Sequence, residues 1–443
     1  MKRSVKKILF LCALVCAGGF AAAEDYSLEG YLEQVEKYSK DLSLSRKNVE
    51  QAELVVRQAW AAVLPTIFAQ VGYKRNLLDI KQPQPIGAST TAMGGIYPLA
   101  LQKMDVNKDN EVTLALGLNQ VIFNKKAFAG LKYGKEYQNI SGIAYDETKS
   151  VILTAAKKAY FGALLLQNVL TVREDAQEND RAVWENMKKR YEAGLAQELE
   201  MLRAEVTWQS RTPEVTQARR DLKIALLQLK NLAGIDINEE IVLTTPLAEF
   251  PALPGEVDIE ECLARRGDYT LLLRQKRLTE ISAEVAAADH YPTVSASLNL
   301  ARTGSGDKAK LMESPINSLQ LGVTIGLPIF SGGAVSSQVQ SEKIDIAKQD
   351  TEIAKKREDI QTEITQLELS LREAWQRIET SQKTQETAQR AYNLARLSLE
   401  NGLITQLELN DSAVQLEQVQ LGYYSAVYDY LSRYFDWEKA LGL

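Results

Sequence analysis

The chain has 443 residues, of which 25% are charged and 45% are hydrophobic; this composition is typical of a folded protein and excludes an intrinsically disordered one. Its length allows about two or three domains. The formal net charge is −6 at pH 7, and because an acidic chain repels phosphate backbones, we expect no nucleic acid among its partners.

The first 23 residues are predicted to be a secretion signal, so that the mature chain begins at Glu24. Four basic residues precede an apolar run from 8 to 17, and three alanines at 21–23 supply a cleavage site. The run is too short to cross a bilayer as a helix, which takes about 20 apolar residues. Cleavage removes four positive charges, moving the net charge from −6 to about −10, and leaves Cys262 as the lone cysteine. A lipid anchor on Cys16 is the alternative.

Residues 24–243 are predicted to form a first structural repeat that contains two strands, at about 66–76 and 111–122. In both segments every second residue is apolar, as in a strand with one apolar face. These apolar residues are Ile67, Ala69, Val71, Tyr73, Val112, Leu114, Leu116 and Leu118. Each segment has about ten residues, enough for a tilted strand to cross a bilayer. A half-buried strand of a soluble sheet would alternate in the same way. Residues 77–110 between them are expected to be an external loop.

Two long helices, at about 125–193 and 198–233, are predicted to complete this repeat. Gly194 is expected to end the first in a left-handed conformation, after which the chain returns antiparallel. Pro213 lies inside the returning helix, and we expect a kink or a short break there. Residues 244–255 contain three prolines, which exclude a helix interior and predict a linker.

Residues 256–443 are predicted to repeat the same order, with strands at about 293–302 and 318–328 and helices at about 334–401 and 405–440. The first of these helices carries apolar residues at intervals of seven, as in a coiled coil. They are Val339, Ile346, Ile353, Ile360 and Leu367. At 1.5 Å per residue this helix is about 100 Å long, far more than an ordinary globular domain needs. Gly402 is expected to end it as Gly194 ends its counterpart.

Short motifs recur in the same order in the two halves, and the later ones recur at a nearly constant offset; Pro65 and Pro292 are 227 positions apart because the first half carries a longer loop. Leu-Pro-Thr at 64–66 and Tyr-Pro-Thr at 291–293 open strands, Ile-Phe-Asn and Ile-Phe-Ser close them, and a Gly-Leu pair follows each long helix. Phe123 and Phe330 are 207 positions apart, and Gly194 and Gly402 are 208 apart. A repeat of this length indicates a duplicated domain and not a short-repeat solenoid.

Four membrane strands would leave two edges unpaired, and lipid cannot satisfy their backbone groups. The sheet is therefore predicted to close between chains. Two chains would give eight strands, whose interior side chains fill, whereas three would give twelve strands and leave room for a lumen.

With the motifs above and the closing Trp437-Glu438-Lys439-Ala440-Leu441-Gly442, the sequence resembles the TolC family of outer-membrane efflux proteins over nearly the whole mature chain. The resemblance implies an α+β fold: a duplicated unit of long coiled-coil helices plus four membrane β-strands, closing as a homotrimer into a 12-stranded β-barrel on a periplasmic α-barrel. It implies an outer-membrane location with a long periplasmic extension. It also implies a passive exit duct of a tripartite efflux or type I secretion system, surrounded by outer-membrane lipid. The implied partners are a periplasmic adaptor (membrane fusion) protein and an inner-membrane pump or secretion ATPase.

The resemblance also implies roles for residues near the two turns. Gly194 and Leu195, with Gly402 and Leu403, would be the periplasmic tips that contact the adaptor; simple helix capping is the alternative. Glu408 and Asp411 match positions at which the family often carries aspartates that narrow the closed end of the tunnel. Since they are spaced i, i+3 they share a helix face, and a trimer would gather six carboxylates into a periplasmic gate. A solvated helix face is the alternative.

No enzyme chemistry is predicted, and no cofactor or metal. One histidine and one cysteine in the mature chain exclude a His/Cys zinc cluster. The Gly-Ser-Gly at 304–306 lacks the third glycine and the context of a dinucleotide loop, and it is expected to be an external loop. The alternative function is a periplasmic coiled-coil scaffold or adaptor that never enters a membrane, in which the strands form a soluble sheet.

Overall fold

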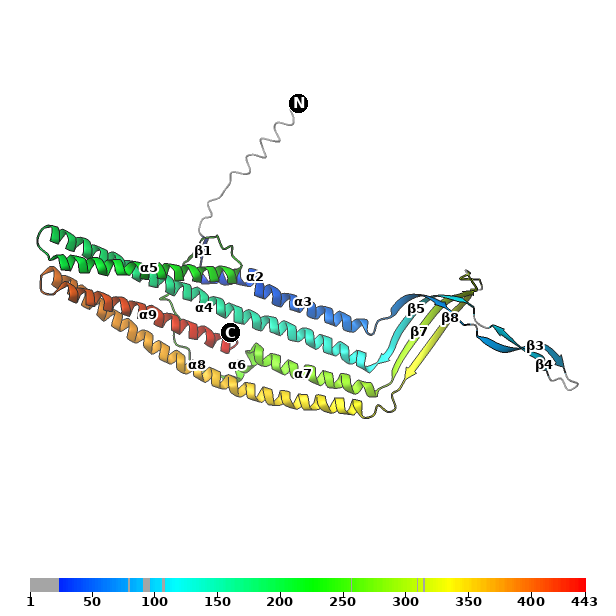
Figure 1. Cartoon of the computed structure of the whole chain (residues 1–443). Coiled ribbons are helices and arrows are strands. Elements are labelled where there is room, and N and C mark those ends of the chain that lie inside the picture. The colour runs from blue at the N-terminus through cyan, green and yellow to red at the C-terminus, as the bar shows by residue number, and fades with distance from the viewer. Residues whose placement is uncertain are drawn as a thin grey trace, which may run out of the picture. The chain divides into compact units, whose positions relative to one another are not determined.

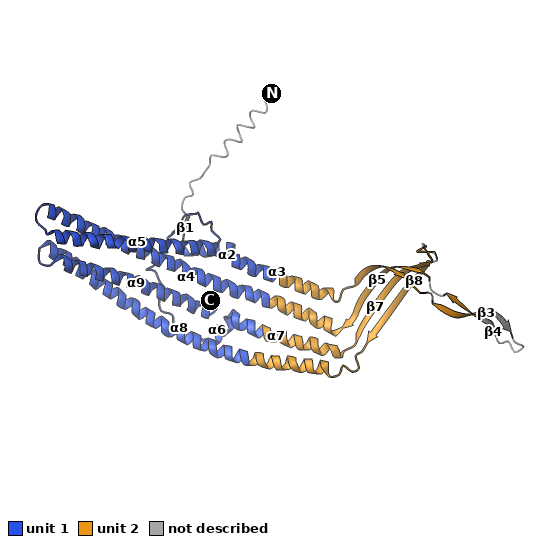
Figure 2. Cartoon of the chain, in the orientation of Figure 1, with its two compact units in different colours: residues 1–50, 140–273, 351–443 blue, residues 51–139, 274–350 orange. Residues whose placement is uncertain are grey.

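The structure is a computed structural model that describes residues 24–78, 80–90, 96–105, 108–255, 257–308, 310–313 and 315–443 (Figure 1). The predicted signal at 1–23, with the alternative anchor at Cys16, lies outside these residues. The chain divides into two compact units, shown in Figure 2: residues 1–50, 140–273 and 351–443 form unit 1, and residues 51–139 and 274–350 form unit 2. The division falls within four helices, so each unit contains part of every one of them.

The helices account for most of the described chain. In order they are α2 (Leu28–Tyr38), α3 (Lys40–Ala61), α4 (Lys125–Glu192), α5 (Glu198–Ala233), α6 (Ile259–Arg265), α7 (Gly267–Ala287), α8 (Ala334–Glu400) and α9 (Gln406–Ala440), with a 3₁₀ turn at Ala288–His290. The two longest, α4 and α8, have 68 and 67 residues. Within unit 1 each of them is followed by a turn and an antiparallel partner, and the two turns lie at the same end of the unit (Figure 1).

Unit 1 has an aromatic core that fixes the middle of its helices. Tyr160 and Tyr430 are fully buried, and both use the phenol to satisfy a backbone carbonyl. Tyr160 donates to the oxygen of Tyr26 at 2.7 Å, and Tyr430 donates to that of Pro251 at 2.9 Å. Pro251 belongs to the segment 244–255, which has no helix or strand and packs against this core. A short parallel pair, β1 (Glu24–Tyr26) and β6 (Ile241–Leu243), lies beside it.

Unit 2 contains a four-stranded antiparallel sheet in the order β2-β5-β7-β8. The strands are β2 (Thr66–Arg75), β5 (Asn110–Asn124), β7 (Thr293–Gly306) and β8 (Ile316–Gly326). The two halves of the sequence thus contribute two strands each, and the halves meet where β5 pairs with β7. Within the described residues β2 and β8 each have a neighbour on one side only, which leaves both edges of the sheet open.

Register divides this sheet into an apolar face and a polar face, because paired residues project to the same side. The apolar face collects the alternating residues of all four strands, for example Ile67 opposite Leu118, and Leu118 opposite Leu298. On the edge strand β8 these side chains are exposed: Leu319, Leu321, Val323 and Ile325 are 69%, 78%, 62% and 69% accessible. The opposite face carries mostly Ser, Thr, Asn, Gln and Gly. The apolar face is therefore left uncovered, whereas a soluble sheet buries such a face.

Three details differ from the sequence-based expectations. The segment 77–110 is not only loop, since it contains an antiparallel pair, β3 (Lys81–Thr90) and β4 (Ile96–Asp105). The Gly-Ser-Gly at 304–306 is not a loop, because β7 extends through it in register with β5. Helix α5 continues through Pro213 without the expected break. Contacts with α4 on the preceding turns, the stacked Trp208 and Trp184 rings and the Arg211–Asp180 ion pair, hold the helix there.

Candidate functional site

The turns after α4 and α8 have the same backbone geometry. Gly194 and Gly402 adopt φ values of 72° and 71°, in the left-handed region that glycine enters without strain. In the first turn the amide of Gly194 donates to Tyr191 and that of Leu195 to Arg190, at 2.8 and 2.7 Å. The second turn repeats both bonds at 2.9 and 2.8 Å. This pair of bonds is the Schellman motif, which ends a helix by satisfying its last carbonyls.

Both turns expose leucines at matching positions. Leu195 and Leu403, one residue after each glycine, are 71% and 77% accessible. Leu199 and Leu407, five residues after each glycine, are 54% and 69% accessible. The second pair was not among the predicted site residues, although the repeat offset identifies it. These four exposed leucines lie at one end of unit 1, and we call them the tip patch.

The two predicted gate residues are in different environments. The Glu408 carboxylate accepts a bond of 2.7 Å from the backbone N–H of Thr405, while the Thr405 hydroxyl accepts one from the N–H of Glu408 at 3.3 Å. This is a capping box, and the Thr-x-x-Glu spacing is its sequence signature. The bond from the Thr405 backbone lowers the pKa of Glu408, with a smaller contribution from the Thr405 hydroxyl. Asp411 is exposed and has no ion pair within the described part of the chain.

Equivalent positions in the first repeat carry a different charge pattern. Glu200 lies six residues after Gly194, as Glu408 lies six after Gly402, but the position matching Asp411 is Arg203. The N-cap of α5 is Gln197, whose side chain makes no capping bond. A pair of carboxylates at these offsets thus belongs to the second turn alone.

A buried ionic cluster joins α4, α5 and α9 farther along the same helices. Glu417 of α9 is 6% accessible and accepts a bond of 2.9 Å from Arg211 and a short one from Arg173. Arg211 also binds Asp180 at 2.8 Å, and both arginines contact Glu214. The cluster borders a cavity of about 190 Å³. No local pattern in the sequence predicts it, since Arg173 and Glu417 are 244 residues apart.

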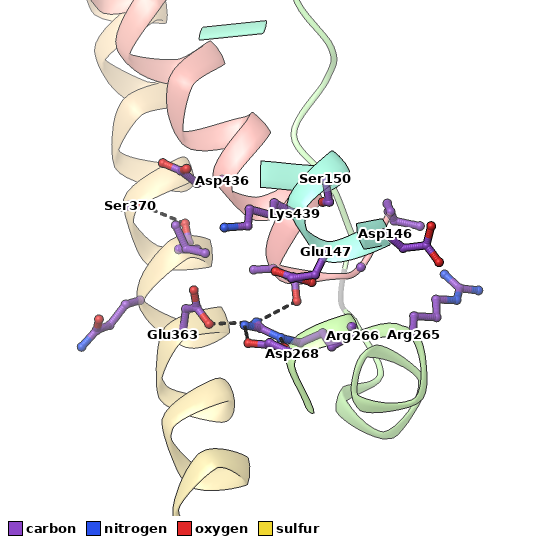
Figure 3. Close-up of a pocket in the computed structure, with 16 residues that line it drawn as sticks. Asp146, Glu147, Ser150, Arg265, Arg266, Asp268, Glu363, Ser370, Asp436 and Lys439 are labelled. Carbon is purple, nitrogen blue, oxygen red and sulfur yellow. Dashed lines mark hydrogen bonds and ion pairs between the residues drawn. The ribbon is translucent and has the colours of Figure 1, made fainter. Parts of the chain in front are cut away.

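A second ionic cluster, shown in Figure 3, lies where α7 begins beside α8 and the end of α9. Arg266 is 8% accessible, and its guanidinium donates two bonds to Asp268, at 2.9 and 2.7 Å. It also donates to Glu363 of α8 at 2.8 Å and to the carbonyl of Ala440 at 3.0 Å. Lys356 reaches Asp268 from α8 at 2.8 Å. The cluster lines a cavity of about 610 Å³ and ties the second-repeat helices together.

These bonds favour the charged form of both partners. Burial disfavours the charged form of each group, but the hydrogen bonds and opposite charges outweigh it. The pKa of Arg266 is therefore raised, and the pKa of Asp268 is held well below its usual range.

We expect acid to weaken the protein partly through Asp268. Because its folded pKa is lowered, its contribution to stability is complete above the ordinary carboxyl pKa of about 4 and is lost as pH falls toward the folded pKa. The Asp268→Asn variant should melt at a lower temperature than the wild type at neutral pH and lose less on going from about pH 5 to pH 2. Thermal unfolding followed by circular dichroism measures both. Asp359→Asn, at an exposed carboxylate of α8, is the control and should behave as the wild type does. Equal acid sensitivity of Asp268→Asn and wild type would contradict the assignment.

The described part of the chain contains no helix long and apolar enough to span a bilayer. Within the same residues no group of three or more His, Cys, Asp and Glu side chains is arranged to hold a metal ion.

Comparison with known proteins decides the family. The family model for outer membrane efflux proteins matches residues 31–235 and 272–443. The chain belongs to the outer membrane efflux protein family. The predicted family is thus confirmed, and with it the function as an outer-membrane channel component of an export system and the location in the outer membrane.

Individual members of the family are distant relatives. The chain is 21% identical over 378 residues to the alkaline protease secretion protein AprF of Pseudomonas aeruginosa, covering 84% of this chain and 75% of that protein. It is 21% identical over 365 residues to the outer membrane protein TolC of Escherichia coli, covering 79% and 73%. The crystal structure of the Campylobacter jejuni CmeC outer membrane channel superposes with a TM-score of 0.76 at 17% identity, covering 94% of this chain and 85% of that chain. The fold is therefore that of an outer-membrane efflux channel, mostly helical with a small sheet.

Proposed function

We propose that three copies of the chain form a passive exit duct, in which the four-stranded sheets join into one twelve-stranded barrel. The observation that carries the proposal is the sheet with two open edges and an exposed apolar face. Open edges are costly in lipid, and pairing β8 of one copy with β2 of the next removes all of them. The two edge strands run in opposite directions in the sheet, so this junction would be antiparallel like the others.

The polar face would line the lumen. On this face Gly117 leaves room for the Phe68 ring to lie across β5. A Cβ atom at position 117 would come within 2.2 Å of that ring and within 2.8 Å of the Asn299 side chain. Twelve strands enclose a space wider than side chains fill. Cargo passing through such a lumen would meet small polar side chains and few charges.

The tip patch would contact a periplasmic adaptor, which connects the duct to an inner-membrane pump or a secretion ATPase. Its exposed leucines support this, because apolar side chains at the centre of a contact supply most of the binding energy. Energy for transport would come from that pump, and the chain itself would catalyse no reaction.

Glu408 and Asp411 would narrow the periplasmic end of the duct as a ring of six carboxylates that binds cations. We expect the double variant Glu408→Gln/Asp411→Asn to raise the resting conductance of purified trimers in planar bilayers several-fold and to weaken block by divalent cations. Glutamine at position 408 preserves the capping box, so the change removes charge and leaves the helix start intact. Glu200→Gln, at the matching place in the first repeat, is the control. Conductance and block equal to those of the wild type would defeat the gate assignment.

The proposal is tested by extraction of bacterial envelopes. A barrel embedded in lipid should stay in the membrane through high salt and alkaline carbonate and leave as trimers only with detergent. The alternative, a periplasmic scaffold, predicts release by salt or carbonate. The exposed leucines, valines and isoleucines of the apolar face argue against that alternative.

A further inference from the structure

The apolar face of the sheet carries an arginine where the apolar rows of β7 and β8 end. Arg302 of β7 follows Leu300 on this face and lies in register with Leu114 of β5 and Asn317 of β8. Its side chain is exposed. Toward the helices, every residue of β7 on the same face is apolar, from Val294 to Leu300.

Arg302 has no acidic partner, and the same holds for Arg75, which lies on this face at the end of β2. Among the residues that the structure describes, no carboxylate lies within ion-pair distance of either guanidinium, and the apolar face contains no acidic residue. Two basic residues off the apolar face do have acidic partners. Lys74, on the polar face, is 3.9 Å from Glu111, and Lys108 binds Asp307 at 2.6 Å. A cation without an intramolecular partner, on a chain of net charge −6, is available to an external anion.

A groove leads from Arg302 across the apolar rows. It has a volume of about 380 Å³ and is lined by the small side chain of Ala69, by Val71, by leucines of β5 and β7, and at one end by Arg302 with Asn317. An apolar channel with a cation and an amide at its end matches an acyl chain joined to an anionic headgroup.

The position of Arg302 along the strand fits the outer boundary of a bilayer. From Thr293, where β7 leaves the helical region, to Arg302 is nine residue steps, or about 30 Å of strand. With the usual tilt of membrane strands this is a rise of about 23 Å, close to the height of the apolar band of such barrels, about 25 Å. Arg302 would therefore lie at headgroup level on the side where the strands connect through loops.

We infer that Arg302 binds the phosphate group of an outer-leaflet lipid, one of whose acyl chains occupies the groove. The inference rests on the proposed membrane sheet. Guanidinium binds phosphate through two parallel charge-assisted hydrogen bonds, and it gives up its hydration more readily than an ammonium group does. Asn317 is placed to donate a further bond from its amide to the same headgroup.

Binding of defined lipids to purified trimers in neutral detergent, counted by native mass spectrometry, tests the inference. The probes are phosphatidic acid, diacylglycerol with the same acyl chains, and inorganic phosphate. Wild-type trimers should bind phosphatidic acid in preference to diacylglycerol, and inorganic phosphate should not displace it. Arg302→Gln should weaken binding of phosphatidic acid about tenfold and leave binding of diacylglycerol unchanged. Lys74→Gln, which removes one positive charge from the opposite face, should bind as the wild type does.

Arg302→Lys keeps the charge without the planar fork and should fall between wild type and Arg302→Gln, which provides a second test if the glutamine variant assembles poorly. Equal binding of phosphatidic acid by wild type and Arg302→Gln would overturn the inference, as would equal binding of the two lipids or full displacement by inorganic phosphate. Each of these outcomes leaves the trimeric duct in place. Failure of the duct proposal would be seen in the extraction experiment, in which wild-type protein would leave the envelope without detergent.

Discussion

A negative charge at the tip patch should reduce export by at least about 100-fold while trimers still assemble. In Leu195→Asp and Leu403→Asp an exposed leucine would become a carboxylate that has no partner when the adaptor covers it. A loss of about 3 kcal/mol in the free energy of adaptor binding is enough for a 100-fold reduction. Each substituted site occurs three times in a trimer, so the total loss can be larger. Both substitutions lie outside the helices that they join, so the effect on folding should be small.

Export of a secreted cargo, together with chemical cross-linking of trimers in the same cells, measures the two properties separately. Gln197→Glu is the matched control, because it adds the same charge two residues from Leu195 and keeps the leucine. It should export normally. Normal export by Leu403→Asp and Leu195→Asp would remove the tip patch as the contact surface, and loss of trimers would show that the leucines act in assembly.

The second large effect is expected for Arg266→Met. This change leaves Asp268, Glu363 and the Ala440 carbonyl without their common donor, and breaking a buried ionic group in this way costs about 3–5 kcal/mol. The thermal midpoint of detergent-solubilised protein, compared at equal protein concentration, should fall well below that of the wild type. Arg265→Met is the control: Arg265 is 49% accessible, pairs with Glu261 on the same helix, and should matter little. Equal midpoints for the two variants would contradict the structural role of the cluster.

Both turns and all four sheet strands could be recognised from the sequence because their signals are local. A strand with one apolar face alternates along its own residues, and the left-handed residue that ends a long helix is marked by glycine at Gly194 and Gly402. The capping box at Thr405 and Glu408 has an equally local signature, four residues long, although neither the gate nor the solvated-face interpretation of Glu408 includes it.

Other features were not predictable, because they depend on residues far apart in the sequence or because the local residues favour a different structure. Glu417 and Arg173 meet only after both repeats have folded. Prolines at Pro83, Pro85 and Pro98 argue against strands. Within the described residues, however, β3 and β4 have no other strand beside them, so each keeps an edge at which proline is tolerated. Arg302 ends an apolar alternation, and only register across β5 and β8 shows which side chains surround it.

The central claim, that sister subunits pair through the open edges of their sheets, is tested most directly by disulfide cross-linking between β8 and β2. One cysteine replaces Leu321 and a second replaces in turn Ile67, Ala69, Val71 or Tyr73, all on the apolar face, in a chain whose Cys262 is changed to alanine. A disulfide requires Cβ atoms about 4 Å apart, so only neighbouring strands in the right register can form one. We predict a covalent ladder ending at the trimer for one β2 position under oxidising conditions, and its collapse to monomer on reduction. Monomers alone at all four positions, in protein extracted from the outer membrane, would contradict the shared barrel.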